Sequence, residues 1–135
     1  MEATITQPQE QELLLTPSRA PSDSLKAFLS ELEEYLGERV LLLEKDLENL
    51  ARDSLTAGGK RIRPALVHAC GGDDPKNRES LIKAAAIVEF VHVATLVHDD
   101  VLDDATIRRG RRSIYASHGA TAAILLGDAL FAHAL

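Results

Sequence analysis

The segment LVHDDVLDDATIRRGRR (residues 96–112) holds the residues best suited to chemistry, four aspartates followed by four arginines. In a helix, residues four apart lie one turn apart on the same face, which pairs Asp99 with Asp103 and Asp100 with Asp104. Such like charges repel each other, and the C-terminal end of a helix disfavours anions. A hard cation such as Mg²⁺ would neutralise them, because it binds a few carboxylates and completes its shell with water and phosphate oxygens.

The arginines supply the other half of an anion site. Arg108 and Arg109 directly follow the acidic segment, and a guanidinium binds phosphate through parallel hydrogen bonds. A second basic cluster, GGKRIRP (58–64), presents Lys60 and Arg63 at the expected start of a helix, where backbone N–H groups favour anions. Carboxylates for a metal and two basic clusters for phosphate indicate two phosphorylated substrates.

Each of these patterns also has an ordinary structural explanation. An acidic run followed by a basic run is more often a solvated surface with mutual ion pairs, and a GGKR segment alone is more often a loop. Glu89 and His92 could be a satisfied core pair, Cys70 a small core residue, and Ala94 and Thr95 packing residues. The sequence shows no Ser-His-Asp or Cys-His arrangement for nucleophilic catalysis.

Helices must position these residues, because the apolar spacing is helical throughout and no strand pattern is visible. Ser22 or Ser24 is expected to cap the first helix, and Gly37 to end it. The fourth helix is apolar nearly all round, which predicts burial in a sizeable all-α bundle. The expected helices cover residues 24–36, 40–54, 64–70, 77–104 and 117–135.

Composition narrows the class of protein. A net charge of −6 over 135 residues argues against a nucleic-acid partner, and a single cysteine excludes a disulfide within the chain and fits a cytoplasmic location. No signal peptide is visible. The longest apolar stretch, 84–97, is interrupted by two polar residues and is shorter than the ~20 residues that span a bilayer, so no transmembrane segment is predicted.

The chain divides into two parts. Residues 1–22 are rich in Gln, Thr, Ser and Pro and are expected to form a flexible tail, and residues 23–135 a single helical domain. The fifth helix is still running at Leu135 with no polar cap. We therefore expect the N-terminal part of a larger domain that is truncated at its C-terminal end.

Taken together, the motifs resemble the trans-type polyprenyl diphosphate synthases. GGKRIRP, the DDVLD of residues 99–103 with the RRG after it, and LLGDAL stand in that family's order and spacing, over residues 24–135. The resemblance implies the isoprenoid-synthase helical bundle, here its N-terminal five or so helices with the first of two aspartate-rich motifs. It also implies Mg²⁺, isopentenyl diphosphate and an allylic diphosphate as ligands, and a homodimer, with a heteromer as the alternative.

Site roles follow from the resemblance residue by residue. Asp99 and Asp103 would bridge magnesium to the allylic diphosphate, which Arg108 would also contact, and these three are the expected catalytic residues. Asp100 would lie behind these residues and contact the metal less directly than Asp99 and Asp103. The side chains expected to hold the diphosphate of isopentenyl diphosphate are Lys60, Arg63, His92 and Arg109.

Product length and one departure complete the resemblance. Ala94 and Thr95 precede the aspartates where bulky aromatics stop the family's short products, so two small residues predict a product longer than farnesyl. Arg112 stands where relatives often have proline, and Tyr115 where they have Asn or His, which puts the turn after RRG in question.

The implied activity is condensation of the two diphosphates after magnesium-assisted ionisation of the allylic one, with the released diphosphate accepting the final proton. The 135 residues alone are expected to be inactive, because the second metal-binding motif is missing. Two alternatives remain at this stage: a non-catalytic helical subunit of a heteromeric prenyl synthase, and a diphosphate- or metal-binding bundle without turnover.

Overall fold

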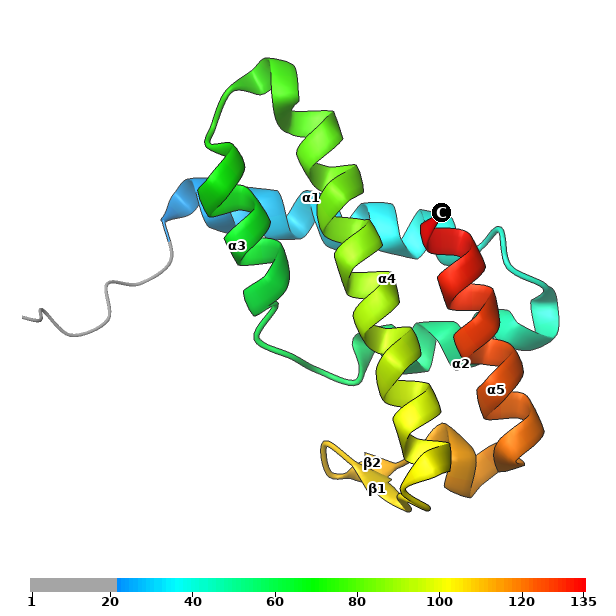
Figure 1. Ribbon diagram of the computed structural model, residues 1–135. Coiled ribbons are helices and arrows are strands. Elements are labelled where there is room, and N and C mark those ends of the chain that lie inside the picture. The colour runs from blue at the N-terminus through cyan, green and yellow to red at the C-terminus, as the bar shows by residue number, and fades with distance from the viewer. Residues whose placement is uncertain (1–21) are drawn as a thin grey trace, which may run out of the picture.

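The computed structural model describes residues 22–135, which form an all-α fold with one small β-hairpin (Figure 1). The predicted tail, residues 1–22, lies outside the described part except for Ser22. The elements follow in the order α1 (Asp23–Val40), α2 (Lys45–Thr56), α3 (Ile62–Gly71), the 3-10 turn η1 (Pro75–Asn77), α4 (Arg78–Leu102), β1 (Ile107–Arg108), β2 (Arg111–Arg112) and α5 (Ile114–Ala134).

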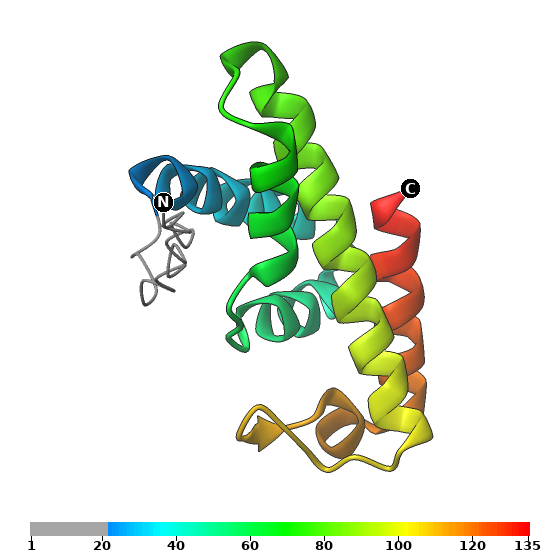
Figure 2. The same ribbon diagram turned by 60° about the vertical axis from the view of Figure 1, so that its left-hand side comes forward.

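Helix α4 is the central element of the bundle. Helix α5 runs antiparallel beside it, α3 lies along its first half, and α1 and α2 cross behind it (Figures 1 and 2). Close approach of α4 and α5 requires Gly127, because a Cβ there would lie 2.1 Å from the His98 Nε2 atom. The largest fully buried side chains of this core are Phe28, Leu32, Leu36, Phe90, Leu126 and Leu130.

The first helix begins as predicted but ends later. The Ser22 hydroxyl accepts a hydrogen bond from the Leu25 N–H at 3.2 Å and so caps α1. The predicted stop at Gly37 is wrong, because α1 continues to Val40. Leu36 and Val40 extend a stripe of buried residues spaced four apart, and burying them outweighs the ~1 kcal/mol that a glycine costs inside a helix.

Helix α4 is buried on one face only within residues 22–135. Ile87, Val88 and Val91 on another face are exposed, so the predicted burial all round is not met by the described helices. Pro75–Leu102 and Ile114–Ala134 are long and apolar enough to cross a membrane. Both are longer than the apolar stretch 84–97 identified in the sequence. Core helices of soluble proteins share these properties, and the two segments pack against each other here.

The hairpin corrects the expectation that the chain forms no strands. Strands β1 and β2 are antiparallel, with Arg108 opposite Arg111. Arg109 and Gly110 form the two-residue turn with φ of 50° and 76°, and a type I′ turn requires positive φ at both of these positions. The glycine of the RRG motif, Gly110, was the available signal in the sequence.

Helix α5 begins earlier than predicted. Its first residue is Ile114, capped by Ser113, whose Oγ accepts a hydrogen bond from the Ala116 N–H at 2.9 Å. The predicted start at Ser117 or Gly119 instead marks a kink, where Gly119 has a φ of 84°. Cys70, expected in the core, is exposed on α3.

Candidate functional site

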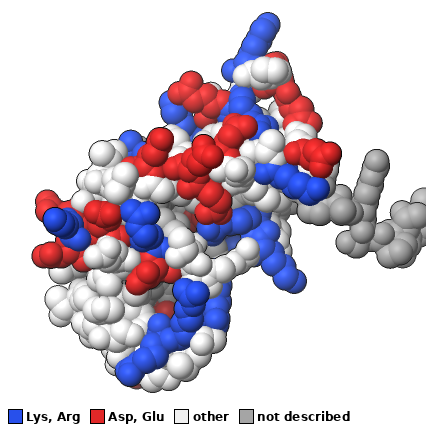
Figure 3. All heavy atoms as spheres, turned by 180° about the vertical axis from the view of Figure 1, so that it is seen from behind, with Lys and Arg blue, Asp and Glu red and all other residues white. Residues whose placement is uncertain are grey.

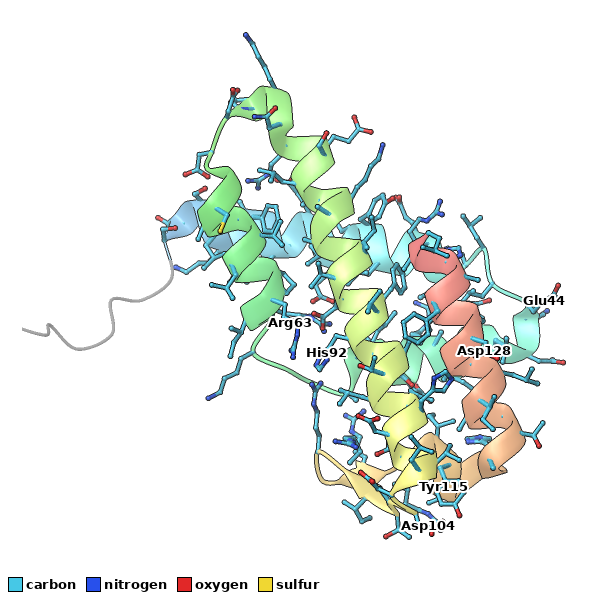
Figure 4. The ribbon with its side chains drawn as sticks, in the orientation of Figure 1. Glu44, Arg63, His92, Asp104, Tyr115 and Asp128 are labelled. Atoms are coloured by element: carbon cyan, nitrogen blue, oxygen red, sulfur yellow. The ribbon has the colours of Figure 1, made fainter. Side chains whose placement is uncertain are left out.

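Four side chains predicted to bind one diphosphate meet in a single pocket. This diphosphate pocket has a volume of about 280 Å³ and also contains Arg61 and Glu89. Figure 4 shows Arg63 and His92 side by side, one from the first turn of α3 and the other from the middle of α4. The predicted residues that line it are Lys60, Arg63, His92 and Arg109.

Arg61 fixes the loop that presents the neighbouring cations. It has a left-handed backbone with a φ of 47°, and only 11% of its side chain is exposed. Its guanidinium donates to Glu33 at 2.6 Å, to Glu89 at 2.5 Å and to the Leu55 carbonyl at 2.8 Å. Glu89 thus pairs with Arg61 and not with His92, and the sequence alone did not reveal this clamp.

Two glycines make room for Arg109 above the same loop. The Arg109 Nη1 atom donates to the Gly58 carbonyl, which ties the hairpin turn to the loop before α3. A Cβ at Gly59 would lie 3.0 Å from that Nη1 atom. The Gly-Gly pair therefore lets the RRG turn and the GGKR loop, 51 residues apart, form one cationic wall.

The surroundings of His92 disfavour its charged form. Burial lowers its pKa, Arg63 and Arg109 lower it further, and Glu89 opposes them only in part. A neutral imidazole offers one N–H donor to an incoming phosphate oxygen. The same positive surroundings would favour a bound anion, so the pocket is electrostatically suited to a diphosphate.

The four aspartates have divided roles. Asp100 is 4% exposed and accepts two hydrogen bonds from Arg108, at 2.8 Å from Nε and 2.5 Å from Nη2. Asp104 accepts the Tyr115 hydroxyl at 2.7 Å. Asp99 and Asp103 are exposed, and no protein partner for either carboxylate occurs within the described part of the chain.

This geometry fits magnesium held through a substrate. Asp99 and Asp103 lie one turn apart, with the Asp103 N–H donating to the Asp99 carbonyl at 2.8 Å. Residues 22–135 contain no cluster of three or more His, Cys, Asp or Glu side chains that could enclose a metal. Magnesium commonly binds through one or two carboxylates with water and phosphate oxygens as the remaining ligands, and two such carboxylates are present here.

The two predicted chain-length residues are separated by the fold. Thr95 is exposed and lines a hollow of about 330 Å³ together with Val88 and Val91. Arg63 and His92 line this hollow as well as the diphosphate pocket. Ala94 is fully buried in the core. Of the two, only Thr95 faces the apolar hollow beside the diphosphate pocket.

Arg112 and Tyr115, the two residues that depart from the family pattern after RRG, both form hydrogen bonds and leave the turn intact. Arg112 donates to the Ala116 carbonyl at 2.8 Å, across the first turn of α5. Tyr115 reaches back to Asp104 at the end of α4, and the two side chains lie together in Figure 4. Ser113 donates to the Ala105 carbonyl at 2.6 Å. Arg112 therefore joins β2 to α5, and Tyr115 joins α5 to the segment that follows α4.

One grouping unforeseen in the sequence does not form a catalytic triad. Ser24, His68 and Asp73 meet where α1 and α3 pack together. The His68 Nε2 atom lies 3.4 Å from the Ser24 hydroxyl and 3.3 Å from the Asp73 carboxylate, so both partners share one ring nitrogen. A triad needs them on opposite nitrogens, and here the His68 Nδ1 atom is buried without a partner.

Comparisons with known proteins agree with the geometry. Residues 44–135 match the family model described as Polyprenyl synthetase. The chain is 42% identical over 121 residues to heptaprenyl diphosphate synthase component 2 of Geobacillus stearothermophilus, covering 84% of this chain and 34% of that protein. It is 36% identical over 107 residues to an all-trans-nonaprenyl-diphosphate synthase (geranyl-diphosphate specific) of Rhodobacter capsulatus, covering 76% and 32%.

Solved structures show the same likeness. A heptaprenyl diphosphate synthase from Staphylococcus aureus superposes with a TM-score of 0.75 at 35% identity, covering 82% of this chain and 35% of that one. The chain spans about a third of the length of the curated relatives it matches.

Proposed function

The chain belongs to the polyprenyl synthetase family, and from that membership we propose that this protein is a prenyltransferase that condenses isopentenyl diphosphate with an allylic diphosphate. The observation that carries the proposal is the meeting of Lys60, Arg63, His92 and Arg109 in one pocket beside α4, with Asp99 and Asp103 at the C-terminal end of that helix. Residues 23–135 would be the N-terminal part of the synthase domain, in the cytoplasm.

The residues of this chain have distinct tasks in the proposed reaction. Asp99 and Asp103 would hold magnesium, which when bound draws charge onto the departing diphosphate. Arg108 uses Nε and Nη2 on Asp100, which leaves Nη1 to donate to the same diphosphate. The diphosphate pocket orients the second substrate for attack.

The proposed reaction needs no protein base. The allylic C–O bond breaks and its electron pair leaves with the diphosphate. The double bond of isopentenyl diphosphate then forms the new C–C bond, and the released diphosphate accepts the proton that is lost. His92 has a lowered pKa and serves here as a hydrogen-bond donor.

We propose a product longer than farnesyl. Small Thr95 leaves the apolar hollow along α4 open below the aspartates. The names of the relatives cover several product lengths, among them nonaprenyl, heptaprenyl and geranylgeranyl, so the expectation depends on Thr95 and not on those names.

The assembly is proposed to be a homodimer, and one observation favours a heteromer as the second candidate. The Geobacillus stearothermophilus relative is named component 2 of its synthase. If this chain is likewise one component, Asp99 and Arg108 would still act at its own site. Sedimentation of the purified protein, alone and with co-purifying partners, distinguishes the two assemblies.

The test compares the protein with its Asp99→Ala, Asp103→Ala double variant. Supplied with Mg²⁺, geranyl diphosphate and labelled isopentenyl diphosphate, the unaltered complete protein should form labelled polyprenyl diphosphates, and the double variant should lose at least ~100-fold in turnover. Equal turnover in the two proteins would overturn the proposal. Magnesium-dependent binding of geranyl diphosphate without condensation would favour the binding bundle instead. Asp46→Ala, on the exposed start of α2, is the matched control.

A further inference from the structure

A second pocket shares Arg109 with the diphosphate pocket. This hairpin pocket has a volume of about 240 Å³ and opens between α2, the second half of α4, the β-hairpin and the first turn of α5. Figure 2 shows the hairpin and the start of α5 facing α2 across this part of the molecule. Ser54 and Ala57 form its α2 wall. Its other walls differ sharply in polarity.

The rim of the hairpin pocket carries more positive than negative charge. Arg111 has no carboxylate partner among residues 22–135, and Arg112 donates only to the uncharged Ala116 carbonyl. The charge of Arg108 is matched by Asp100. Figure 3 shows Lys and Arg side chains gathered at the lower end of the molecule, where Figure 1 places the hairpin.

Carboxylates do not cancel this rim. Besides Asp100, the lining contains one further acid, Asp53 on α2, against Arg109, Arg111 and Arg112. Neither the proposed magnesium site nor the diphosphate pocket uses Arg111 or Arg112. The second half of the RRGRR segment therefore has no task in the proposed reaction.

The floor of the hairpin pocket is apolar. It is formed by Val93, Leu96 and Val97 from α4, with Ile114 from α5. An apolar floor below unneutralised guanidinium groups suits a ligand with an anionic head and a short hydrocarbon tail. The volume lies below the ~300 Å³ at which ligand pockets for larger molecules begin, so the tail must be small.

We propose that the hairpin pocket is a further ligand site, beside the two diphosphate sites with which it shares Arg108 and Arg109, and that it binds a small amphipathic phosphate ester through Arg111 and Arg112. The head is bound by the guanidinium groups of these two arginines at the rim, and the tail lies on Val93, Leu96 and Ile114. Arg109 lines both pockets, so the two sites have one cation in common. Binding does not depend on turnover, and the site stands whether or not the proposed activity is confirmed.

The test uses isopentyl phosphate, a saturated ester that cannot condense, and follows the backbone amides by NMR titration of the purified chain. The amides of Ser54 and Ser117, which line the hairpin pocket, should shift saturably. Arg111→Gln with Arg112→Gln should weaken this binding at least ~10-fold, because it removes charge-assisted hydrogen bonds. Ser54→Leu, which fills the pocket without changing its charge, should weaken it by a similar factor.

Two comparisons make the test decisive. Lys60→Gln with Arg63→Gln removes two of the four cations that line the diphosphate pocket and should leave these shifts in place. Lys45→Gln with Lys76→Gln controls for net charge on exposed sites. Inorganic phosphate should bind at least ~10-fold more weakly than the ester, since it lacks the tail. Unchanged binding in the Arg111, Arg112 variant, loss in the Lys60, Arg63 variant, or equal affinity for inorganic phosphate would each overturn the proposal.

Discussion

Asp100 and Arg108 form an ion pair that closes the turn between α4 and β1, with both guanidinium hydrogen bonds directed to one carboxylate oxygen. Asp100 is buried, whereas its sequence neighbour Asp99 is exposed. Adjacent aspartates of one motif therefore have different physical roles. One holds the arginine in place, and the other remains available to a cation.

Replacing each aspartate by asparagine should separate these roles. Asp100→Asn should lower the free energy of unfolding by ~1–3 kcal/mol, because it weakens two charge-assisted hydrogen bonds to a partly buried arginine. Asp99→Asn should leave stability unchanged or raise it slightly, since it removes a negative charge from a helix C-terminus. Urea denaturation followed by circular dichroism measures both, and equal stability of the two variants would contradict the assignment.

An aromatic substitution should mainly change product length at Thr95 and mainly reduce stability at Ala94. Thr95→Tyr places a ring in an exposed hollow and should cost little stability while shortening the products of the complete enzyme. Ala94→Phe should destabilise the fold by ~1–3 kcal/mol, because the core around a fully buried alanine has no room for a ring. Product chromatography and thermal denaturation give the two readouts, and an unchanged product spectrum in Thr95→Tyr would count against the hollow as the path of the growing chain.

Two histidines should make the fold less stable in mild acid. Burial lowers the pKa of His92 and of His133, assisted at His92 by Arg63 and at His133 by Arg39. Between the lowered pKa and the ordinary value of ~6.5 the unfolded chain binds more protons than the folded one, so stability falls as the pH drops through that window. Denaturation at pH 7.5, 6.5 and 5.5 measures this trend.

The control is the double variant His92→Gln, His133→Gln. It removes both groups whose pKa is lowered, so its stability should change less between pH 7.5 and pH 5.5 than that of the unaltered chain. An identical pH dependence in the two proteins would show that other groups dominate.

Tyr115 should ionise at a higher pH than an ordinary tyrosine. Its hydrogen bond to the Asp104 carboxylate and the negative charge of that group raise its pKa above the ordinary value. An ultraviolet titration should therefore show a phenol component above pH ~10. Tyr115→Phe should remove this component, and Asp104→Asn should return it to the ordinary range. A titration unaffected by Asp104→Asn would mean that the contact does not persist in solution.

Much of the fold was predictable because it depends on local spacing. The apolar period predicted five helices. Ser22 marked the start of α1, and Pro64 lies in the first turn of α3, which begins two residues earlier, at Ile62. The errors occurred where packing outweighed a local signal. Gly37 did not end α1, since Leu36 and Val40 on either side of it are buried in the core.

The candidate site was predictable as a set of residues but not as an arrangement. The motifs named Lys60, Arg63, His92 and Arg109, and the fold brings them together. The sequence did not reveal that Arg61 of the same motif is a structural clamp. That role depends on Glu33, which is 28 residues away in the chain, and no local pattern encodes such a partner.

By itself, the sequence determined the helical periods, the order of the motifs and the charged residues they carry, because these depend on residues close together in the chain. Tertiary structure alone decided which charges remain free. Asp100 and Arg61 are neutralised by partners that folding delivers, whereas Asp99, Arg111 and Lys60 have no partner carboxylate or cation within residues 22–135. The reason is physical, since burial and pairing depend on which distant side chains the packed helices bring within hydrogen-bonding distance.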